Sequence, residues 1–322
     1  MCYFNGQKVA REEFIRLKHL EKLVAKYDFL NRDAIVGFDF SPIAVLKPIP
    51  ENEDFEIAQM EWGFLPDPLK WPFVETRQQA FNMRRGYTDS RGKFQQPLNF
   101  LNAVSEELLL PNKVYRKAAL ERRCIILSSG FYDWRHIHPL NKRTGQPLKT
   151  AVKYPYRVNV KGKEYFFMAG IWQQWTDAET GETVDTCSIV TTEANLVMEQ
   201  IHNSKKRMPT MLTDDLAWEW MFEKLPEQRI SEIANWQIPW QDLSYYTLAK
   251  DFLTPLILQK NLFIPTCLRS ISPGRKNNRK GKLNYFNNKI STCFRCPPLA
   301  ELVPFFREEL LRPNTFFNWG WT

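Results

Sequence analysis

The residue with the most distinctive chemistry is Cys2, which directly follows Met1. Its small side chain favours removal of the methionine, and the new terminus then carries an α-amine beside a thiol. An α-amine has a pKa of about 7.7–8.0, so part of it is neutral near pH 7. The amine adds to an aldehyde to form an imine, on which the thiol closes as a five-membered thiazolidine. Cys2 is therefore a candidate nucleophile, although the same residue also suits a position that need only be small.

Three polar residues that lie far apart in the sequence are candidates to assist such a reaction: Asn82, Asp133 and His202. His202 follows a predicted helix, and an imidazole can transfer protons near pH 7. The amide of Asn82 can orient an amine or a sugar oxygen. Each residue also has a possible structural role. His202 could form a structural hydrogen bond, Asn82 could stand in a turn, and Asp133 could face solvent from a strand.

Aromatic residues suggest contacts with nucleic acid. Trp62 and Phe64 stand at the end of a predicted strand, where they either stack on unpaired bases or belong to the core. Lys205 and Lys206 add positive charge close to His202, although a solvated run of charge explains them equally well.

Four segments of the chain, taken in order, resemble the SRAP family, the SOS-response-associated peptidase-like or abasic-site processing proteins. They are Cys2 behind Met1, Glu61–Pro66 with Phe81–Arg84, Arg123–Trp134, and Ile201–Pro209. The resemblance covers roughly residues 2–250. It implies a DNA-repair protein that recognises abasic sites in single-stranded DNA and traps their aldehyde covalently through Cys2, with no metal or organic cofactor.

The resemblance also implies roles for single residues. His202 corresponds to the acid/base that helps the deoxyribose ring to open. Asp133 stands where the family has a catalytic glutamate, with one methylene less of reach. Arg84 and Arg207 match the arginines of the Asn-x-Arg and Arg-Met-Pro segments and are expected to hold phosphates, with Arg85 as a further cation.

Two features depart from the family pattern. Residues 85–87 are Arg, Gly and Tyr where a glutamate is common, and extra residues, Asn203–Lys206, separate His202 from Arg207. Both differences affect the expected DNA contacts more than the central reaction.

Two other functions remain open from the sequence. As the N-terminal nucleophile of a cysteine peptidase, Cys2 would attack a peptide bond in the chain itself or in other peptides, with His202 as base. Alternatively, the chain is a non-enzymatic nucleic-acid module that works through a basic tail. Retention of Met1 separates the three hypotheses, because it blocks the amine and leaves tail-driven binding unchanged.

The apolar pattern predicts an α+β fold, with a curved, mainly antiparallel sheet or open barrel and peripheral helices. Strands and helices do not alternate regularly, which argues against a doubly wound parallel sheet. Residues 66–95 are expected to form a long loop. Strands are expected at 34–40, 43–49, 55–62, 123–127, 131–135, 156–160, 165–175 and 187–192. Helices are expected at 11–27, 98–110, 114–121, 192–201 and 214–224, the last with Asp214 at its N-cap.

Charge divides the chain into a body, residues 1–252, and a basic C-terminal extension, residues 253–322, of unassigned structure. The chain has 44 Lys and Arg against 36 Asp and Glu, and the extension holds 11 and 3 of these. The body therefore carries 33 residues of each sign. A DNA-binding groove in the body must then depend on a few well-placed cations.

The six cysteines are scattered and indicate free thiols in a reducing compartment. Cys293 and Cys296 have half the spacing of a zinc site but no second pair nearby, so no metal is assigned. The chain has no run of 18 apolar residues and no apolar signal segment near residue 1, which predicts a cytoplasmic protein without a membrane partner. The sequence does not identify which proteins it binds.

Overall fold

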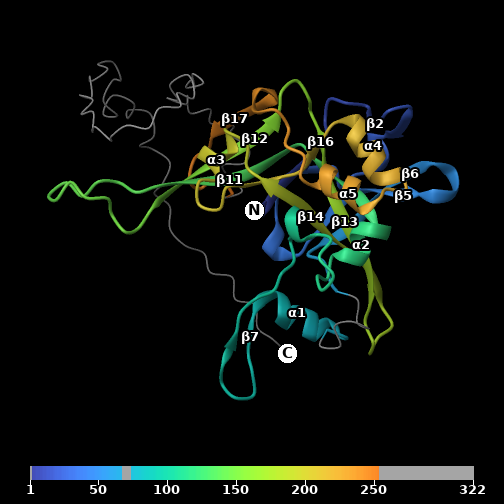
Figure 1. Ribbon diagram of the computed structural model, residues 1–322, viewed down its shortest axis with the longest axis horizontal. Helices are drawn as coiled ribbons and strands as arrows, with labels where there is room; N and C mark the ends of the chain where they lie inside the picture. The colour runs from blue at the N-terminus through green and yellow to red at the C-terminus, as the bar shows by residue number, and fades with distance from the viewer. Residues whose placement is uncertain (1, 67–73, 254–322) are drawn as a thin grey trace, which may run out of the picture. The chain divides into compact units, whose positions relative to one another are not determined.

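The computed structural model describes residues 2–66 and 74–253. At the centre of the fold lies a closed five-stranded barrel, in which β14 pairs with both β6 and β13 and so joins the two ends of one sheet (Figure 1). Neighbouring barrel strands are antiparallel, except β14 and β6, which run parallel. In order, the barrel strands are β14 (Thr183–Glu193), β6 (Asp54–Trp62), β5 (Pro42–Ile49), β10 (Arg123–Ser128) and β13 (Phe166–Thr176).

The burial of these strands follows from their sequences. Every residue of β10 is buried, as its largely apolar composition requires of a strand covered on both faces. Along β6, Phe55 and Ile57 are buried in the first half and Met60 and Trp62 in the second, so the buried face changes partway along the strand.

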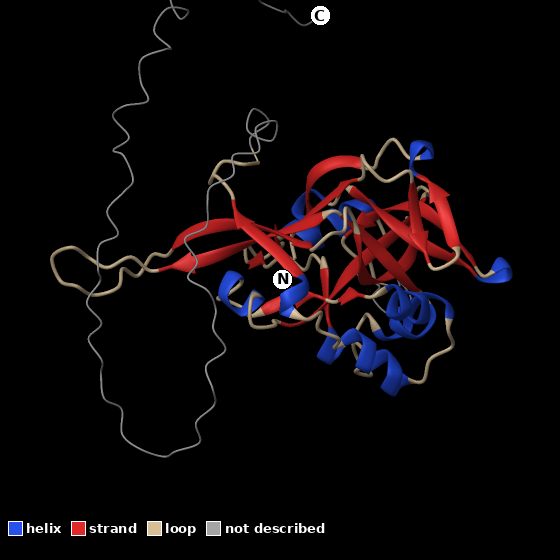
Figure 2. Cartoon of the chain, turned by 90° about the horizontal axis from the view of Figure 1, so that it is seen from above, coloured by secondary structure: helices blue, strands red, loops and turns tan. Residues whose placement is uncertain are grey.

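A second sheet of five strands carries the N-terminal end of the chain. Its strands in order are β17 (Leu243–Thr247), β12 (Val152–Val160), β11 (Gly130–Ile137), β1 (Phe4–Lys8) and β4 (Asn31–Val36). All neighbours in this sheet are antiparallel. β11 and β12 form a long hairpin that extends away from the barrel (Figure 2).

Short elements surround the two sheets, and Figure 2 shows that strands make up the bulk of the fold with helices at its periphery. The short strands are β2 (Phe14–Leu17), β3 (Leu20–Leu23), β7 (Tyr87–Thr88), β8 (Phe94–Gln95), β9 (Asn102–Val104), β15 (Arg207–Pro209) and β16 (Met211–Leu212). The described α-helices are α1 (Arg77–Arg85), α2 (Arg116–Glu121), α3 (Met198–Ile201), α4 (Asp214–Phe222) and α5 (Glu227–Ala234).

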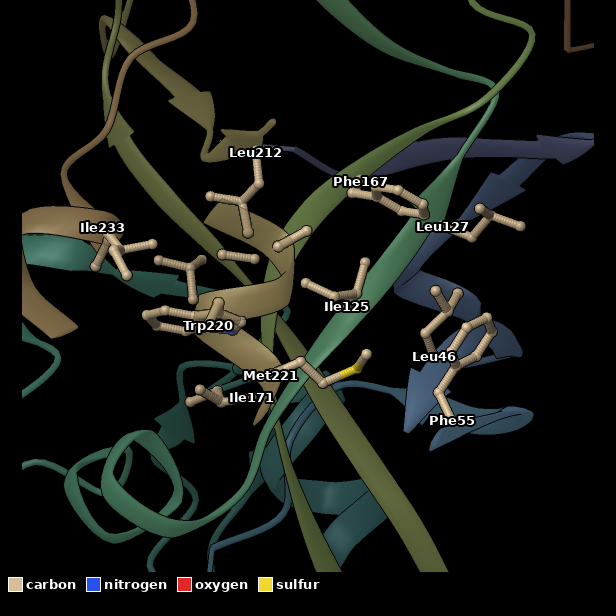
Figure 3. Close-up of a cluster of buried hydrophobic side chains, with 14 of the residues drawn as sticks. Leu46, Phe55, Ile125, Leu127, Phe167, Ile171, Leu212, Trp220, Met221 and Ile233 are labelled. Atoms are coloured by element: carbon tan, nitrogen blue, oxygen red, sulfur yellow. The ribbon is translucent and has the colours of Figure 1, made fainter. Parts of the chain in front are cut away.

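The main core lies between the barrel and α4 (Figure 3). Trp220 of α4 is fully buried, and its indole Nε1 donates to the carbonyls of Cys124 and Gly170 at 3.1 and 3.0 Å. These two bonds satisfy its polar atom and fix the orientation of the ring. Apolar side chains of the barrel and of the neighbouring elements pack around it, among them Leu46, Phe55, Ile125, Leu127, Phe167, Ile171, Leu212, Met221 and Ile233.

Two buried amides of β1 bind the second sheet to the barrel. Gln7 Nε2 donates to the carbonyls of Ala44 and Leu127 at 2.9 and 2.7 Å, and Gln7 Oε1 accepts from the Ala44 N–H at 2.7 Å. Asn5 Nδ2 donates to the Leu127 carbonyl at 3.0 Å, and the Ser128 hydroxyl donates to Asn5 Oδ1 at 2.7 Å. An unpartnered buried polar group costs about 1–3 kcal/mol. This network therefore holds β1 in one register.

The predicted fold class is confirmed, although the barrel is closed instead of open. The helix predicted at 11–27 is wrong, because this segment forms the β2–β3 hairpin. Ile15 and Leu17 are fully buried while Arg16 between them is exposed, which is strand alternation. Lys18 has a left-handed φ of 52° in the tight turn between the strands.

Two further helix predictions are wrong in extent. Residues 98–110 contain β9 and a single 3₁₀ turn, Ser105–Glu107, because pairing with β14 extends residues 102–104. Within 192–201 only α3 is helical, since the first two residues complete β14.

Two further differences concern the N-termini of helices. The predicted loop at 66–95 contains α1, which begins with a capping box between Thr76 and Gln79. The N-cap of α4 is Thr213, whose side chain accepts from the Leu216 N–H, and Asp214 is instead the first helical residue.

Most of the basic extension at 253–322 lies outside the described residues, including the linker-like stretch 270–282 and the pair Cys293 and Cys296. The division of the chain at residue 252 therefore stays a prediction. Within 2–66 and 74–253, no helix has the length and apolarity needed to cross a membrane.

Candidate active site

The register of β1 against β11 brings the N-terminal residues to Asp133. Phe4 pairs with Tyr132, so the same register, continued toward the chain end, puts Tyr3 opposite Asp133 and Cys2 one residue beyond. Burial, and then the negative charge of Asp133, raises the pKa of Tyr3, which agrees with this proximity. The buried amides of β1 thus determine where Cys2 lies.

His202 reaches the same place from the turn after α3. Its side chain and that of Asp133 are each 8% exposed, and His202 Nδ1 lies 3.4 Å from Asp133 Oδ2. Nδ1 is closer, at 2.9 Å, to the backbone carbonyl oxygen of Arg207. A carbonyl can only accept a hydrogen bond, so Nδ1 carries the proton, and the basic nitrogen of the neutral ring is Nε2. The 3.4 Å separation is long for a charge-assisted bond.

Burial shifts the two titratable groups of this pair in opposite directions. It raises the pKa of the Asp133 carboxyl to about 7 and lowers the pKa of His202 to about 4. The positive charge at the chain terminus opposes the first shift and adds to the second. Between these values the carboxyl is protonated and the imidazole, with its proton on Nδ1, is neutral, so the pair carries no net charge. Asp133 therefore titrates near neutral pH. His202 does not, although an unperturbed histidine would.

The thiol of Cys2 is fully buried, and its Sγ donates to the Phe4 carbonyl at 3.7 Å. Burial, and then the charge of Asp133, raises the pKa of this thiol to about 12. The thiol is therefore protonated at pH 7. A protonated thiol is a weak direct nucleophile, because the thiolate is the reactive form.

A cavity of about 410 Å³ opens beside these residues, which is within the size range of small-ligand sites. The rings of Phe4 and Trp134, with centroids 4.6 Å apart, form an aromatic wall. The lining residues are Tyr3, Phe4, Asp133, Trp134, His136, Lys153, His202, Ser204 and Lys205. Asp133 is the one acidic residue among the described residues that line it.

Cys2, Asp133 and His202 thus lie together, although they are far apart in sequence. The shorter side chain of Asp133 does not remove it from the site, because Oδ2 still approaches His202. Asn82 is placed differently. It lies on α1, where its side-chain oxygen accepts from Gln78 Nε2 at 2.9 Å, and it is not among the described residues that line the cavity. Asn82 is therefore not placed at the cavity that Asp133 and His202 line.

The interpretation of Trp62 and Phe64 as base-stacking residues is wrong, because both side chains are fully buried. The indole Nε1 of Trp62 donates to the Leu101 carbonyl at 3.0 Å, and Phe64 packs edge-on against Tyr115. They belong to the core, which is the alternative that the sequence left open.

The two arginines expected to hold phosphates are occupied elsewhere, which corrects that prediction. Arg84 is 5% exposed, forms an ion pair with Glu61 and donates to the Gly63 carbonyl. Arg207 binds Glu106 through two hydrogen bonds of 2.6 and 2.8 Å. Because both guanidinium groups are already neutralised, neither is available for a phosphate in this conformation.

Arg85 is exposed, in contrast to Arg84. Its guanidinium carbon lies 5.0 Å from the ring centroid of Phe81 and 5.8 Å from that of Phe40. Stacked on these rings and open to solvent, Arg85 stays a candidate for contact with a phosphate or a base.

Sequence reasoning missed Trp134, His136 and Lys153 as cavity residues. Trp134 and His136 are two residues apart on β11, a spacing that puts both side chains on one face. That signal was available in the sequence. Lys153 follows only from the hairpin register, in which it pairs with His136.

Comparison with solved structures supports the fold. A crystal structure of a protein from Bacteroides thetaiotaomicron is similar with a TM-score of 0.59 and 24% identity, over 81% of this chain and 100% of that one. A second, from Bordetella bronchiseptica, has a TM-score of 0.50 and 18% identity, over 77% of this chain and 100% of that one. At these identities the likeness concerns the fold alone.

Curated relatives are similar over much of the described region. Abasic site processing protein YoqW of Bacillus subtilis is 29% identical over 180 residues, which cover 56% of this chain and 63% of that protein. Abasic site processing protein HMCES of Xenopus tropicalis is 22% identical over 252 residues, which cover 74% of this chain and 66% of that protein. The chain thus spans a little under two thirds of the length of these relatives.

The family model described as SOS response associated peptidase (SRAP) matches residues 17–253, which is most of the chain. The match includes three of the four motif segments, Glu61–Pro66 with Phe81–Arg84, Arg123–Trp134 and Ile201–Pro209, and begins after Cys2. The chain belongs to the SRAP family.

Proposed function

We propose that this chain processes abasic sites in single-stranded DNA and traps them covalently through the terminal amine and thiol of Cys2. The observation that carries the proposal is that Asp133 and His202 line one cavity, while the buried thiol of Cys2 lies close enough to Asp133 for that charge to raise its pKa. The relatives named abasic site processing proteins support the substrate class.

The proposed reaction begins after Met1 is removed. The neutral α-amine of Cys2 attacks the C1′ aldehyde of the ring-opened sugar to form a carbinolamine, which loses water to give an imine. The Cys2 S–H then adds across the C=N bond, so that sulfur binds C1′ and the proton passes to nitrogen. The product is a thiazolidine, and one water leaves in total. Because the thiol adds in its protonated form, the raised pKa of Cys2 is compatible with this step.

Asp133 and His202 have distinct roles in this scheme. With a pKa of about 7, the Asp133 carboxylate can accept a proton from the α-ammonium and return it to the departing hydroxyl of the carbinolamine. His202 presents Nε2 as a base, since Nδ1 is held by the Arg207 carbonyl. We assign to Nε2 the proton of the C1′ hydroxyl: Nε2 accepts it as the C1′–O4′ bond breaks and the C1′ aldehyde forms, and then returns it to O4′, which becomes the 4′ hydroxyl.

The electrostatics favour this function over a cysteine peptidase. A peptidase needs the Cys2 thiolate, which burial and the Asp133 charge both oppose.

The test is incubation of the purified chain with single-stranded DNA that contains one abasic site, followed by denaturing electrophoresis. We expect a heat-stable adduct, with the added mass on the N-terminal peptide that begins at Cys2. Cys2→Ala keeps the amine but lacks sulfur, so its adduct should require borohydride reduction of the imine. Cys187→Ala, which removes another buried thiol, should trap like the wild type.

Two outcomes would overturn the proposal. One is an adduct that forms equally well on chains that retain Met1. The other is cleavage of peptides that depends on Cys2 in a chain that forms no DNA adduct, a result that would favour the peptidase.

A further inference from the structure

The cavity carries positive side chains that the proposed reaction does not use. Lys153 on β12 and Lys205 in the turn after α3 both line it and are both exposed. Among residues 2–66 and 74–253, neither lysine has an acidic partner within ion-pair distance. The cations expected to bind DNA, Arg84 and Arg207, are in contrast already paired.

The turn that holds Lys205 is fixed to the sheet. Asn203 Oδ1 accepts from the His136 N–H at 2.9 Å, and Asn203 Nδ2 donates to the His136 carbonyl at 2.8 Å. Asn203 thus pairs with His136 as a neighbouring strand would. His136 also pairs with Lys153 across the hairpin. The backbone of His136 therefore holds both the strand that carries Lys153 and the turn that carries Lys205.

The other end of the turn is closed as well. The Lys206 N–H donates to the His202 carbonyl at 2.8 Å, and the Ala194 N–H donates to the Lys206 carbonyl at 2.9 Å. Residues 203–206 are the extra residues that separate His202 from Arg207, and they form an anchored turn beside the cavity. Lys206 differs from Lys205, because its Nζ lies 3.6 Å from Glu199.

We infer that Lys153 and Lys205 form a phosphate site, which holds a phosphodiester of the DNA strand next to the sugar that enters the cavity. The inference rests on the proposed function. A phosphodiester fits because the lining has two unpaired ammonium groups, the His136 ring and the Ser204 hydroxyl, opposed by one carboxyl. Burial keeps that carboxyl, Asp133, largely protonated below about pH 7, which leaves the cavity positive.

The experiment measures binding without reaction. The probe is a single-stranded oligonucleotide with a tetrahydrofuran abasic analogue, which has no aldehyde, and Kd is determined by fluorescence anisotropy over a range of salt. We expect Lys153→Ala and Lys205→Ala each to weaken binding about tenfold, as loss of a charge-assisted contact does. In the double variant, the slope of log K against log salt should become shallower by about 0.7.

Lys206→Ala is the matched control, because it removes the same charge from the same turn. It should change Kd less than about twofold, as expected of an exposed, paired lysine. Asn203→Ala frees the turn, so a subsequent Lys205→Ala should cost less than it does in the wild type, a non-additivity that reports positioning. All the substituted side chains are exposed, and unchanged Tm values will confirm folding.

The outcomes separate this inference from the proposed function. If Lys153→Ala and Lys205→Ala bind like Lys206→Ala, the phosphate site is overturned, whether or not trapping occurs. If the lysine effects appear but the wild type forms no adduct with a reactive abasic strand, the phosphate site stands and the covalent mechanism fails.

Discussion

The region around α1 and the cavity beside Asp133 make opposite use of charged residues, although motif segments point to both. Next to α1, the guanidinium of Arg84 is buried against Glu61 and the Gly63 carbonyl, so its charge is neutralised. In the cavity, the charges of Asp133 and His202 are suppressed by burial instead. Neutralised charges stabilise a fold, whereas groups held away from their preferred protonation state are typical of reactive sites.

The largest expected effect concerns the α1 region. Arg84→Ala removes one partner of a buried pair and should lower the free energy of unfolding by about 3 kcal/mol. Arg77 also binds Glu61 but is 37% exposed, so Arg77→Ala should cost under about 1 kcal/mol. Urea unfolding measures both. If Arg84→Ala is as stable as the wild type yet loses DNA affinity, Arg84 binds DNA and does not serve to stabilise the fold.

The second effect concerns the cavity. Asp133→Asn keeps the size of the side chain but cannot accept the proton, so the rate of adduct formation should fall about a hundredfold. Asp133→Glu, which adds one methylene, should keep more activity than the asparagine variant. Single-turnover trapping measures the rates. An asparagine variant at wild-type speed would make Asp133 a structural residue like Arg84.

The third effect is the pH dependence of trapping. The carboxyl of Asp133 must be ionised to accept a proton, and its pKa is raised to about 7. The rate should therefore rise about tenfold between pH 6 and pH 8, with a midpoint near 7. The asparagine variant should lose this midpoint. A wild-type rate that falls over this range would mean that the protonated carboxyl is the active form.

The smallest effect tests whether the α1 region contacts DNA at all. Arg85 is exposed and stacked near Phe81 and Phe40, so Arg85→Ala should weaken binding of single-stranded DNA about threefold. It should leave the trapping rate at saturating DNA unchanged. A tenfold or greater loss would move the main DNA contact from the cavity to α1.

The sequence predicts correctly those elements whose apolar pattern fits only one type of secondary structure. β10 is a continuous buried run, and β6 has buried apolar residues at short intervals, Phe55, Ile57, Met60 and Trp62, so the sequence predicts both strands. At 11–27 the apolar residues recur at helical spacing, but a tight turn at Lys18 and the pairing of the segment's two halves make it a hairpin. α1 went unnoticed because polar residues dominate it, although Thr76 and Gln79 have the spacing of a capping box.

The candidate site shows the same limit. The motif segments identified Cys2, Asp133 and His202, whose side chains lie together. They did not indicate which arginine is free, because the pairing of Arg84 with Glu61 depends on how α1 packs against β6. Protonation was equally hidden, since burial of Asp133 and His202 arises only when β11 and the turn after α3 meet.

Because the buried amides of β1 anchor this strand, they set the position of the N-terminal residues that precede it. Gln7 and Asn5 fix the strand against the barrel, and each residue of a strand advances about 3.3 Å and reverses the side-chain direction. A glycine inserted between Cys2 and Phe4 would displace Cys2 by that length and turn its thiol to the opposite face. The number of residues between Asn5 and Cys2 therefore determines whether the thiol and the amine reach the site at all.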